Sequence, residues 1–138
     1  MREAAPGRSV TRRCRHRRRA RGRACRDFGA AALATEEILS ADADIFAPCA
    51  LGGVLSEKTI PLLKTPIVAG SANNQLANHA DVRLLMERGI LYAPDYVINA
   101  GGLINVAGEL APGGYDPDAA LSRVATIPTV LADIFRRR

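Results

Sequence analysis

The sequence of 138 residues lacks the features that would assign it at once to several common classes of protein. Its cysteines are odd in number, and no two of them have the two-residue spacing of a zinc knuckle or a redox motif. No apolar run approaches the roughly 20 residues needed to span a bilayer, and the N-terminus has no apolar stretch typical of a secretory signal. We therefore expect a cytoplasmic chain with reduced cysteines, no metal site and no membrane contact.

Positive charge is almost confined to one end of the chain. Residues 1–27 contain eleven arginines, no lysine and two acids, Glu3 and Asp27, which gives a net charge of +9. Residues 28–138 carry eight basic and twelve acidic side chains, and so a net charge of −4. The body therefore has no basic surface of the kind that binds nucleic acid, and a nucleic-acid partner is not expected.

The arginine-rich head, residues 1–27, contains no Ile, Leu or Phe and cannot build a core. We expect it to be disordered, and residues 28–138 to form a separate domain. A nucleic-acid-binding arm and an organelle-targeting peptide are alternatives, although the head has little of the apolar surface that a targeting helix needs. A further hypothesis is that the head is out-of-family sequence, from a GC-rich gene read in the wrong frame or from the wrong start.

From Phe28 onward, apolar segments alternate with helical patterns, which is typical of a parallel sheet with crossover helices. Short apolar runs predict strands at 44–48, 66–70 and 90–94. Helices are expected at 32–39, 56–63, 80–88, 99–110 and 116–135. Asp116 is a good cap for the last helix, and Pro128 predicts a kink or break within it. The fold class is therefore α/β.

Each expected strand ends in a loop of small and polar residues. These loops are 49–53, 71–75 and 99–102. Because ligands of an open parallel sheet lie outside the carboxyl ends of its strands, we expect the three loops to line one ligand site. Glycine and alanine there allow close approach of the backbone, and asparagine offers a donor and an acceptor to an amide or a ribose.

Each of these residues also has a plainer interpretation when it is taken alone. An asparagine in a loop is commonly part of a turn, and Cys49 is typical of a small buried apolar residue. Leu103 and Val106 have a spacing that is more often found in a core. Only the combination of the three loops, in their order along the chain, favours a ligand site.

Three strings in these loops resemble the second half of the Rossmann domain in leucine, valine and phenylalanine dehydrogenases, which are relatives of glutamate dehydrogenase. They are APCALGG at 47–53, GSANNQL at 70–76 and YAPDYVINAGGLINV at 92–106. The resemblance runs from about Phe28 to about Val130. It implies a partial Rossmann-like parallel sheet, the second half of that fold, with flanking helices.

The resemblance also implies a function. Members of the family oxidatively deaminate a branched-chain or aromatic L-amino acid to the 2-oxo acid with NAD, and release ammonia. By resemblance, Cys49, Ala50, Asn73 and Asn99 lie on the cofactor, with Asn99 near the carboxamide of the nicotinamide.

Three further residues correspond to the substrate site of that family. Asn74 matches the asparagine that helps to hold the amino-acid substrate, and Leu103 and Val106 match the apolar wall of its side-chain pocket. Family members are homo-oligomers, so the resemblance implies the same of the intact enzyme.

The departures from the family matter as much as the matches. The sequence contains no G-x-G-x-x-G, and the arginine-rich head occupies the place of that glycine loop. The catalytic lysines and aspartate of the family belong to another domain, and neither Lys58 nor Lys64 corresponds to them. We therefore expect no catalytic residue here, no dehydrogenase activity of the isolated chain, and little or no NAD binding. A complementing piece of a split dehydrogenase is the alternative.

Overall fold

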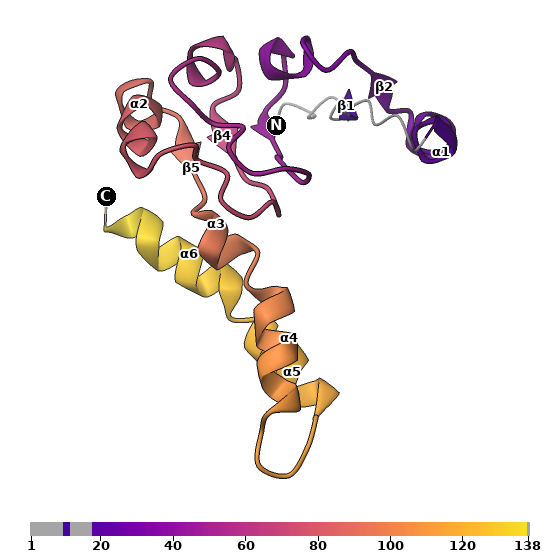
Figure 1. Cartoon of the computed structure of the whole chain (residues 1–138), viewed down its shortest axis with the longest axis vertical. Coiled ribbons are helices and arrows are strands. Elements are labelled where there is room, and N and C mark those ends of the chain that lie inside the picture. Colours follow the sequence, from indigo (N-terminus) through magenta and orange to yellow (C-terminus); the bar gives the residue numbers. More distant parts are fainter. Residues whose placement is uncertain (1–9, 12–17, 138) are drawn as a thin grey trace, which may run out of the picture.

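A computed structural model describes residues 10–11 and 18–137 of the chain. Within these residues, a body that holds the strands lies at one end and an extension made of helices lies at the other (Figure 1). No helix of the described residues is long and apolar enough to cross a membrane.

The body is built on a parallel sheet of three short strands, β3 (Ile45–Phe46), β4 (Ile67–Val68) and β5 (Leu91–Tyr92), in the order β3-β4-β5. Ile45 pairs with Ile67, and Ile67 pairs with Leu91. All three strands lie where apolar runs predict them, although the paired segments are shorter than the runs. The predicted α/β class, with a small parallel sheet and flanking helices, is confirmed.

The core of the body lies around β4 and β5. Its buried residues are Leu55, Ile60, Leu63, Val68, Leu85, Ile90 and Tyr92. The guanidinium of Arg88 donates hydrogen bonds to the carbonyl oxygens of Ile60 and Leu63, the latter at 2.8 Å. It thereby satisfies carbonyls at the end of the short 3-10 helix η3 (Ile60–Leu62), which stands where a longer helix over 56–63 is predicted.

The helix predicted at 80–88 is present as η4 (His79–Asp81) followed by α2 (Val82–Glu87). A capping box between Asn78 and Asp81 starts it. Gly89 follows with a φ of +66°, the left-handed conformation that ends many helices. Leu85 packs into the core from this helix, and so covers the sheet beside β5.

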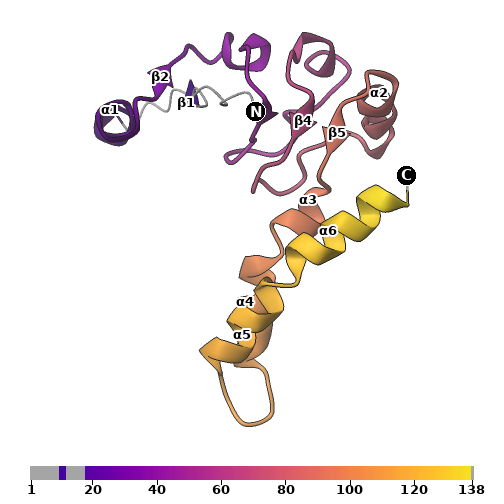
Figure 2. The ribbon, with the colours of Figure 1, turned by 180° about the vertical axis from the view of Figure 1, so that it is seen from behind.

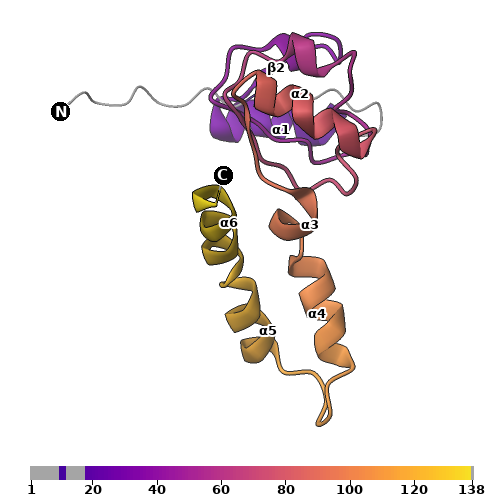
Figure 3. The same ribbon diagram turned by 90° about the vertical axis from the view of Figure 1, so that its left-hand side faces the viewer.

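The extension consists of α3 (Asp95–Ile98), α4 (Gly101–Glu109), α5 (Pro117–Val124) and α6 (Ile127–Arg136). The helices form two columns, with α4 beside α5 and α3 beside α6 (Figure 3). Asp116 caps α5 as predicted, because its Oδ1 accepts hydrogen bonds from the backbone N of Asp118 and Ala119 at 2.9 and 3.2 Å.

The helix expected over 116–135 is divided into two separate helices, and of the kink or break predicted at Pro128 it is the break that occurs. The break falls at 125–126, just before Pro128. Proline lacks a backbone N–H and is favoured in the first turn of a helix, so Pro128 lies in the first turn of α6 and does not merely bend a longer helix.

The arginine-rich head is not wholly without regular structure, which corrects the expectation of disorder for part of it. Val10–Thr11 (β1) pairs in parallel with Ala31–Ala32 (β2), and α1 spans Arg18–Phe28. Arginine and alanine are good helix formers, and Arg23 Nε donates to Asp27 Oδ2 at 3.0 Å one turn further on. The remainder of that expectation, at residues 1–9 and 12–17, lies outside the described residues.

The prediction of a helix at 32–39 is also wrong. That segment begins in β2 and then turns, because Glu37 N donates to Ala34 O at 3.2 Å and Glu37 Oε2 accepts from Ala34 N at 3.0 Å. Only the 3-10 helix η2 (Ile38–Ser40) follows. An isolated helix of two turns gains too few hydrogen bonds to offset the free-energy cost of its nucleation, so the segment forms a local turn. Figure 2 shows this segment and α1 on the opposite side of the molecule from α2.

Candidate ligand-binding cleft

The loop after β3 packs directly against the loop after β4. Gly53 N donates to Asn74 O at 2.7 Å, and Ala72 N donates to Pro48 O at 2.9 Å. A Cβ atom on Gly52 would lie 2.7 Å from the carbonyl oxygens of both Asn73 and Asn74. The first loop therefore requires glycine at this point so that the two backbones can approach.

The loop after β4 is organised around Gln75. The side chain of Gln75 is 0% exposed, and its Nε2 donates to Gly70 O at 2.7 Å and to Ala72 O at 3.0 Å. Asn73 and Asn74 lie between these points and are exposed, and Asn74 has a φ of +50°. Asparagine tolerates this left-handed conformation, so the loop can turn sharply and present two neighbouring side-chain amides to solvent.

The segment after β5 contacts that loop through two side chains. Asp95 Oδ2 accepts a hydrogen bond from Gln75 N at 2.7 Å. Asn99 Nδ2 donates to Asn73 Oδ1 at 2.5 Å and lies 3.4 Å from Ala72 O. Polar contacts therefore connect the segments that follow β4 and β5 at one edge of the sheet.

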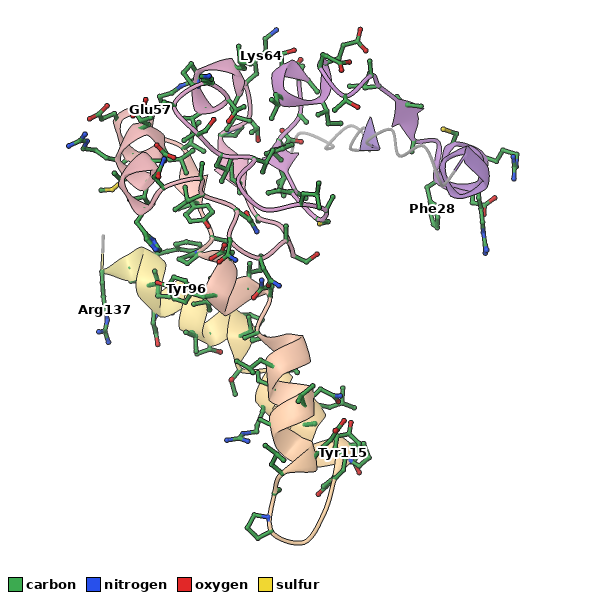
Figure 4. All side chains as sticks on the ribbon, viewed as in Figure 1. Phe28, Glu57, Lys64, Tyr96, Tyr115 and Arg137 are labelled. Carbon is green, nitrogen blue, oxygen red and sulfur yellow. The ribbon has the colours of Figure 1, made fainter. Side chains whose placement is uncertain are left out.

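A cleft of about 660 Å³ opens beside these contacts, between the loop after β4 and the start of the extension. Its lining residues are Asn73, Asn74, Asp95, Tyr96, Asn99, Ala100, Gly102, Leu103 and Val106. Figure 4 shows Tyr96 at the junction between the body and the extension. The loop after β4 contributes two side-chain amides to this lining, and α4 contributes Gly102, Leu103 and Val106.

The apolar side of the cleft is formed by residues that do not belong to the core. Leu103 is 74% exposed and Val106 is 55% exposed. Their spacing of three residues places them on one face of α4. An exposed apolar pair that shares a cleft with three amides can hold a ligand that is polar at one end and apolar at the other.

The carboxylate in the described lining of the cleft is engaged in structure. Both oxygens of the Asp95 carboxylate accept backbone N–H bonds, from Gln75 and from Tyr96, each at 2.7 Å. Beneath the cleft, burial raises the pKa of the Tyr92 phenol above its ordinary 10.0, and the hydrogen bond from Asp95 N partly offsets this. The described lining therefore offers polar contacts for a ligand and no carboxylate that is free of backbone hydrogen bonds.

The structure brings together five of the residues predicted from sequence, namely Asn73, Asn74, Asn99, Leu103 and Val106. Cys49 and Ala50 are exposed on the neighbouring loop and do not line the cleft. Cys49 Sγ lies 3.5 Å from Ser71 N, from which it accepts a weak hydrogen bond.

Sequence reasoning overlooked two lining residues, Asp95 and Tyr96, whereas Ala100 and Gly102 lie in the loop 99–102 that is expected to line the site. A signal for Asp95 was present, because an acid directly after a strand that ends in Pro94 is placed at the ligand edge of a parallel sheet.

Comparison with known proteins gives a consistent result. The chain matches the profile of a family described as Glutamate/Leucine/Phenylalanine/Valine dehydrogenase over residues 9–113, a range that begins within the arginine-rich head. It is 51% identical over 112 residues to a leucine dehydrogenase of Bacillus cereus, which is 81% of this chain and 30% of that relative. It is 54% identical over 109 residues to an L-tryptophan dehydrogenase of Nostoc punctiforme, which is 78% of this chain and 30% of that relative.

The fold of the chain is also similar to a solved structure. The crystal structure of L-tryptophan dehydrogenase from Nostoc punctiforme superposes with a TM-score of 0.79 at 51% identity, and the match covers 84% of this chain and 34% of that one. The chain thus spans about a third or less of the length of the relatives it matches.

Proposed function

Because the chain belongs to the Glutamate/Leucine/Phenylalanine/Valine dehydrogenase family, we propose that it forms one wall of the active site of an amino-acid dehydrogenase. The reaction would be oxidative deamination of a branched-chain or aromatic L-amino acid to the 2-oxo acid and ammonia, with NAD as oxidant. The observation that carries the proposal is that Asn73, Asn74 and Asn99 meet at one cleft with Leu103 and Val106.

The amides suit the nicotinamide end of NAD. Asn99 Nδ2 is bonded to Asn73 Oδ1, whereas within the described residues Asn99 Oδ1 and Asn73 Nδ2 have no hydrogen-bond partner. One acceptor and one donor group therefore remain for a carboxamide, which presents an NH2 and a carbonyl. Bound NAD would supply the hydride acceptor. The sequence contains no G-x-G-x-x-G turn to hold its diphosphate, so we expect weak binding.

The remaining residues of the cleft suit the amino acid. In this proposal the side-chain amide of Asn74 donates to the substrate carboxylate, and Leu103 and Val106 contact its apolar side chain. The leucine, phenylalanine and tryptophan dehydrogenases among the relatives are named for apolar amino acids. An apolar pair that is exposed on α4 fits that substrate class.

The isolated chain should not catalyse the reaction. Hydride transfer requires both reactants to be held in a closed site, together with a base that accepts a proton. The described lining is a single wall, and the one carboxylate in it is occupied by two backbone N–H groups. The catalytic base would come from a further domain or from a separately encoded partner.

Two measurements on the purified chain test the proposal. Formation of NADH is measured with L-leucine, L-valine and L-phenylalanine, and none above background is expected. Millimolar NADH is then titrated into the 15N-labelled chain, and small chemical-shift changes are expected at Asn73, Asn99 and Gly102. Turnover by the chain alone would contradict the proposed inactivity.

A matched pair of variants tests whether NADH binds at the cleft. Asn73→Ala combined with Asn99→Ala should abolish the NADH-induced shifts, because both free groups for the carboxamide are lost. Asn105→Ala should preserve them, because Asn105 is also an exposed asparagine but accepts a hydrogen bond from Tyr115 Oη at 2.7 Å and does not line the cleft. Equal responses of the two variants would rule out the proposed contact.

A further inference from the structure

Asp95 joins the loop after β4 to the start of α3. Its Oδ2 accepts from Gln75 N at 2.7 Å, and its Oδ1 accepts from Tyr96 N at 2.7 Å. Gln75 ends the loop that bears Asn73, whereas Tyr96 lies in α3, just before Asn99. One half-buried carboxylate therefore joins the two segments that carry the amides of the cleft.

Gln75 is the residue through which this contact reaches the loop. Its side chain is fully buried and is bonded to the carbonyl oxygens of Gly70 and Ala72. Its backbone O accepts from Leu55 N at 2.9 Å. Because the main chain and the side chain of Gln75 are both held, residues 70–74 cannot shift without the loss of one of these bonds.

We propose that Asp95 is a positioning residue of the cleft, which acts through Gln75 to hold Asn73 at bonding distance from Asn99. It thereby sets the spacing at which the two amides present their free donor and acceptor. Only the identity of the ligand, a nicotinamide, rests on the proposed function; the positioning is a property of this chain by itself.

The choice of an acid at this position has a chemical reason. A carboxylate has acceptor oxygens only and can serve two N–H donors, as Asp95 does. An asparagine would turn its NH2 toward one of those donors and lose that bond. The alternative is that Asp95 only stabilises the start of α3. That role requires the hydrogen bond from Tyr96 N, but it does not explain the hydrogen bond from Gln75 N.

The two roles are separated with Asp95→Ala and Asp95→Asn in the full chain, measured by backbone amide hydrogen exchange and by the side-chain amide signals of Asn73 and Asn99. Asp116→Ala is the matched control. Asp116 also accepts two backbone N–H bonds at the start of a helix, from Asp118 and Ala119, but it lies outside the cleft.

In Asp95→Ala the Gln75 amide should exchange at least about tenfold faster, because a hydrogen bond to a charged acceptor is lost. The side-chain amide signals of Asn73 and Asn99 should shift. Asp95→Asn should show smaller changes at the same residues, and Asp116→Ala should change only the start of α5. Should the alanine variant fail to fold, Asp95→Ser, which also removes both carboxylate oxygens, is judged by the same criterion.

The proposal is overturned if Asp95→Ala alters only residues 96–99 and leaves Gln75, Asn73 and the Asn99 side chain as in the parent chain. NADH titration adds an independent result. If NADH causes no chemical-shift change in the parent chain, the proposed binding of NAD is contradicted. Hydrogen exchange still decides the role of Asp95 in that case. If the parent responds and Asp95→Ala responds equally, Asp95 does not position the cleft.

Discussion

Asn99 Nδ2 lies 2.5 Å from Asn73 Oδ1, although 26 residues separate the two asparagines in the chain. The contact depends on the parallel pairing of β4 with β5, which brings the segments that follow the two strands to the same edge of the sheet. Within the part of the chain that the structure describes, it leaves one polar group of each side chain without a hydrogen-bond partner. The sheet thus determines the relative positions of two polar groups that the local sequence around either one does not specify.

The close approach of the first two loops predicts an effect of Gly52→Ala. The added Cβ would lie 2.7 Å from the carbonyl oxygens of Asn73 and Asn74, so one backbone must move. We expect a loss of about 1–3 kcal/mol in the free energy of unfolding, measured by urea denaturation. In Gly102→Ala the added Cβ meets nothing within 4 Å, and alanine in a helix should stabilise by up to about 1 kcal/mol. Equal stabilities of the two variants would contradict the packing of these loops.

Much of the body could be predicted from sequence because its signals are local. The apolar runs before Pro48, Gly70 and Pro94 mark strands, and their order with intervening helices implies a parallel sheet. The rule that loops at the carboxyl ends of parallel strands share one edge then places Asn73 and Asn99 together. Such reasoning positions backbones, and it reaches a side chain only where that side chain lies in a loop at the edge.

The contacts that join the loops could not be predicted in the same way. The hydrogen bond from Gln75 N to Asp95 Oδ2 depends on how the ends of β4 and β5 are positioned relative to each other. The burial of the Gln75 side chain contradicts the usual exposure of glutamine. The head was misjudged for another reason. Apolar periodicity is absent from residues 18–27, but helix formation there is supported by the intrinsic preferences of Arg and Ala and by the Arg23–Asp27 pair.

Asn74 allows the conformation of the loop to be separated from its chemistry. Its φ of +50° is readily adopted by asparagine and by glycine, and costs most other residues about 1 kcal/mol. Asn74→Gly should therefore leave the free energy of unfolding nearly unchanged, whereas Asn74→Ala should lower it by about 1 kcal/mol. Both variants remove the side-chain amide, so both should lose any response to an added amino acid. If only the alanine variant lost that response, loop conformation and not the amide would be responsible.

Leu103 and Leu85 should differ sharply when they are substituted. Leu103 is 74% exposed on α4, and Leu103→Ala should change the free energy of unfolding by less than about 0.5 kcal/mol. Leu85 is fully buried in the core, and Leu85→Ala should cost about 2–5 kcal/mol. Thermal unfolding of both variants measures the difference. A large loss for Leu103→Ala would show that this side chain is part of a core and not a wall of the cleft.

Tyr92 should make the stability of the chain depend on pH in the alkaline range. Burial raises the pKa of its phenol above 10.0, whereas in the unfolded chain it keeps that ordinary value. As pH rises past about 10, the unfolded chain loses a proton that the folded chain retains, so the contribution of Tyr92 to stability falls.

Tyr92→Phe removes this titration. The other tyrosines and both lysines are present in the parent and the variant, so their titrations cancel in the difference between the two. Urea unfolding between about pH 8 and pH 11 should therefore show the parent losing stability relative to Tyr92→Phe above about pH 10. A difference that stays constant across this range would mean that the phenol titrates alike in both states, as it would if it were solvated in the folded chain.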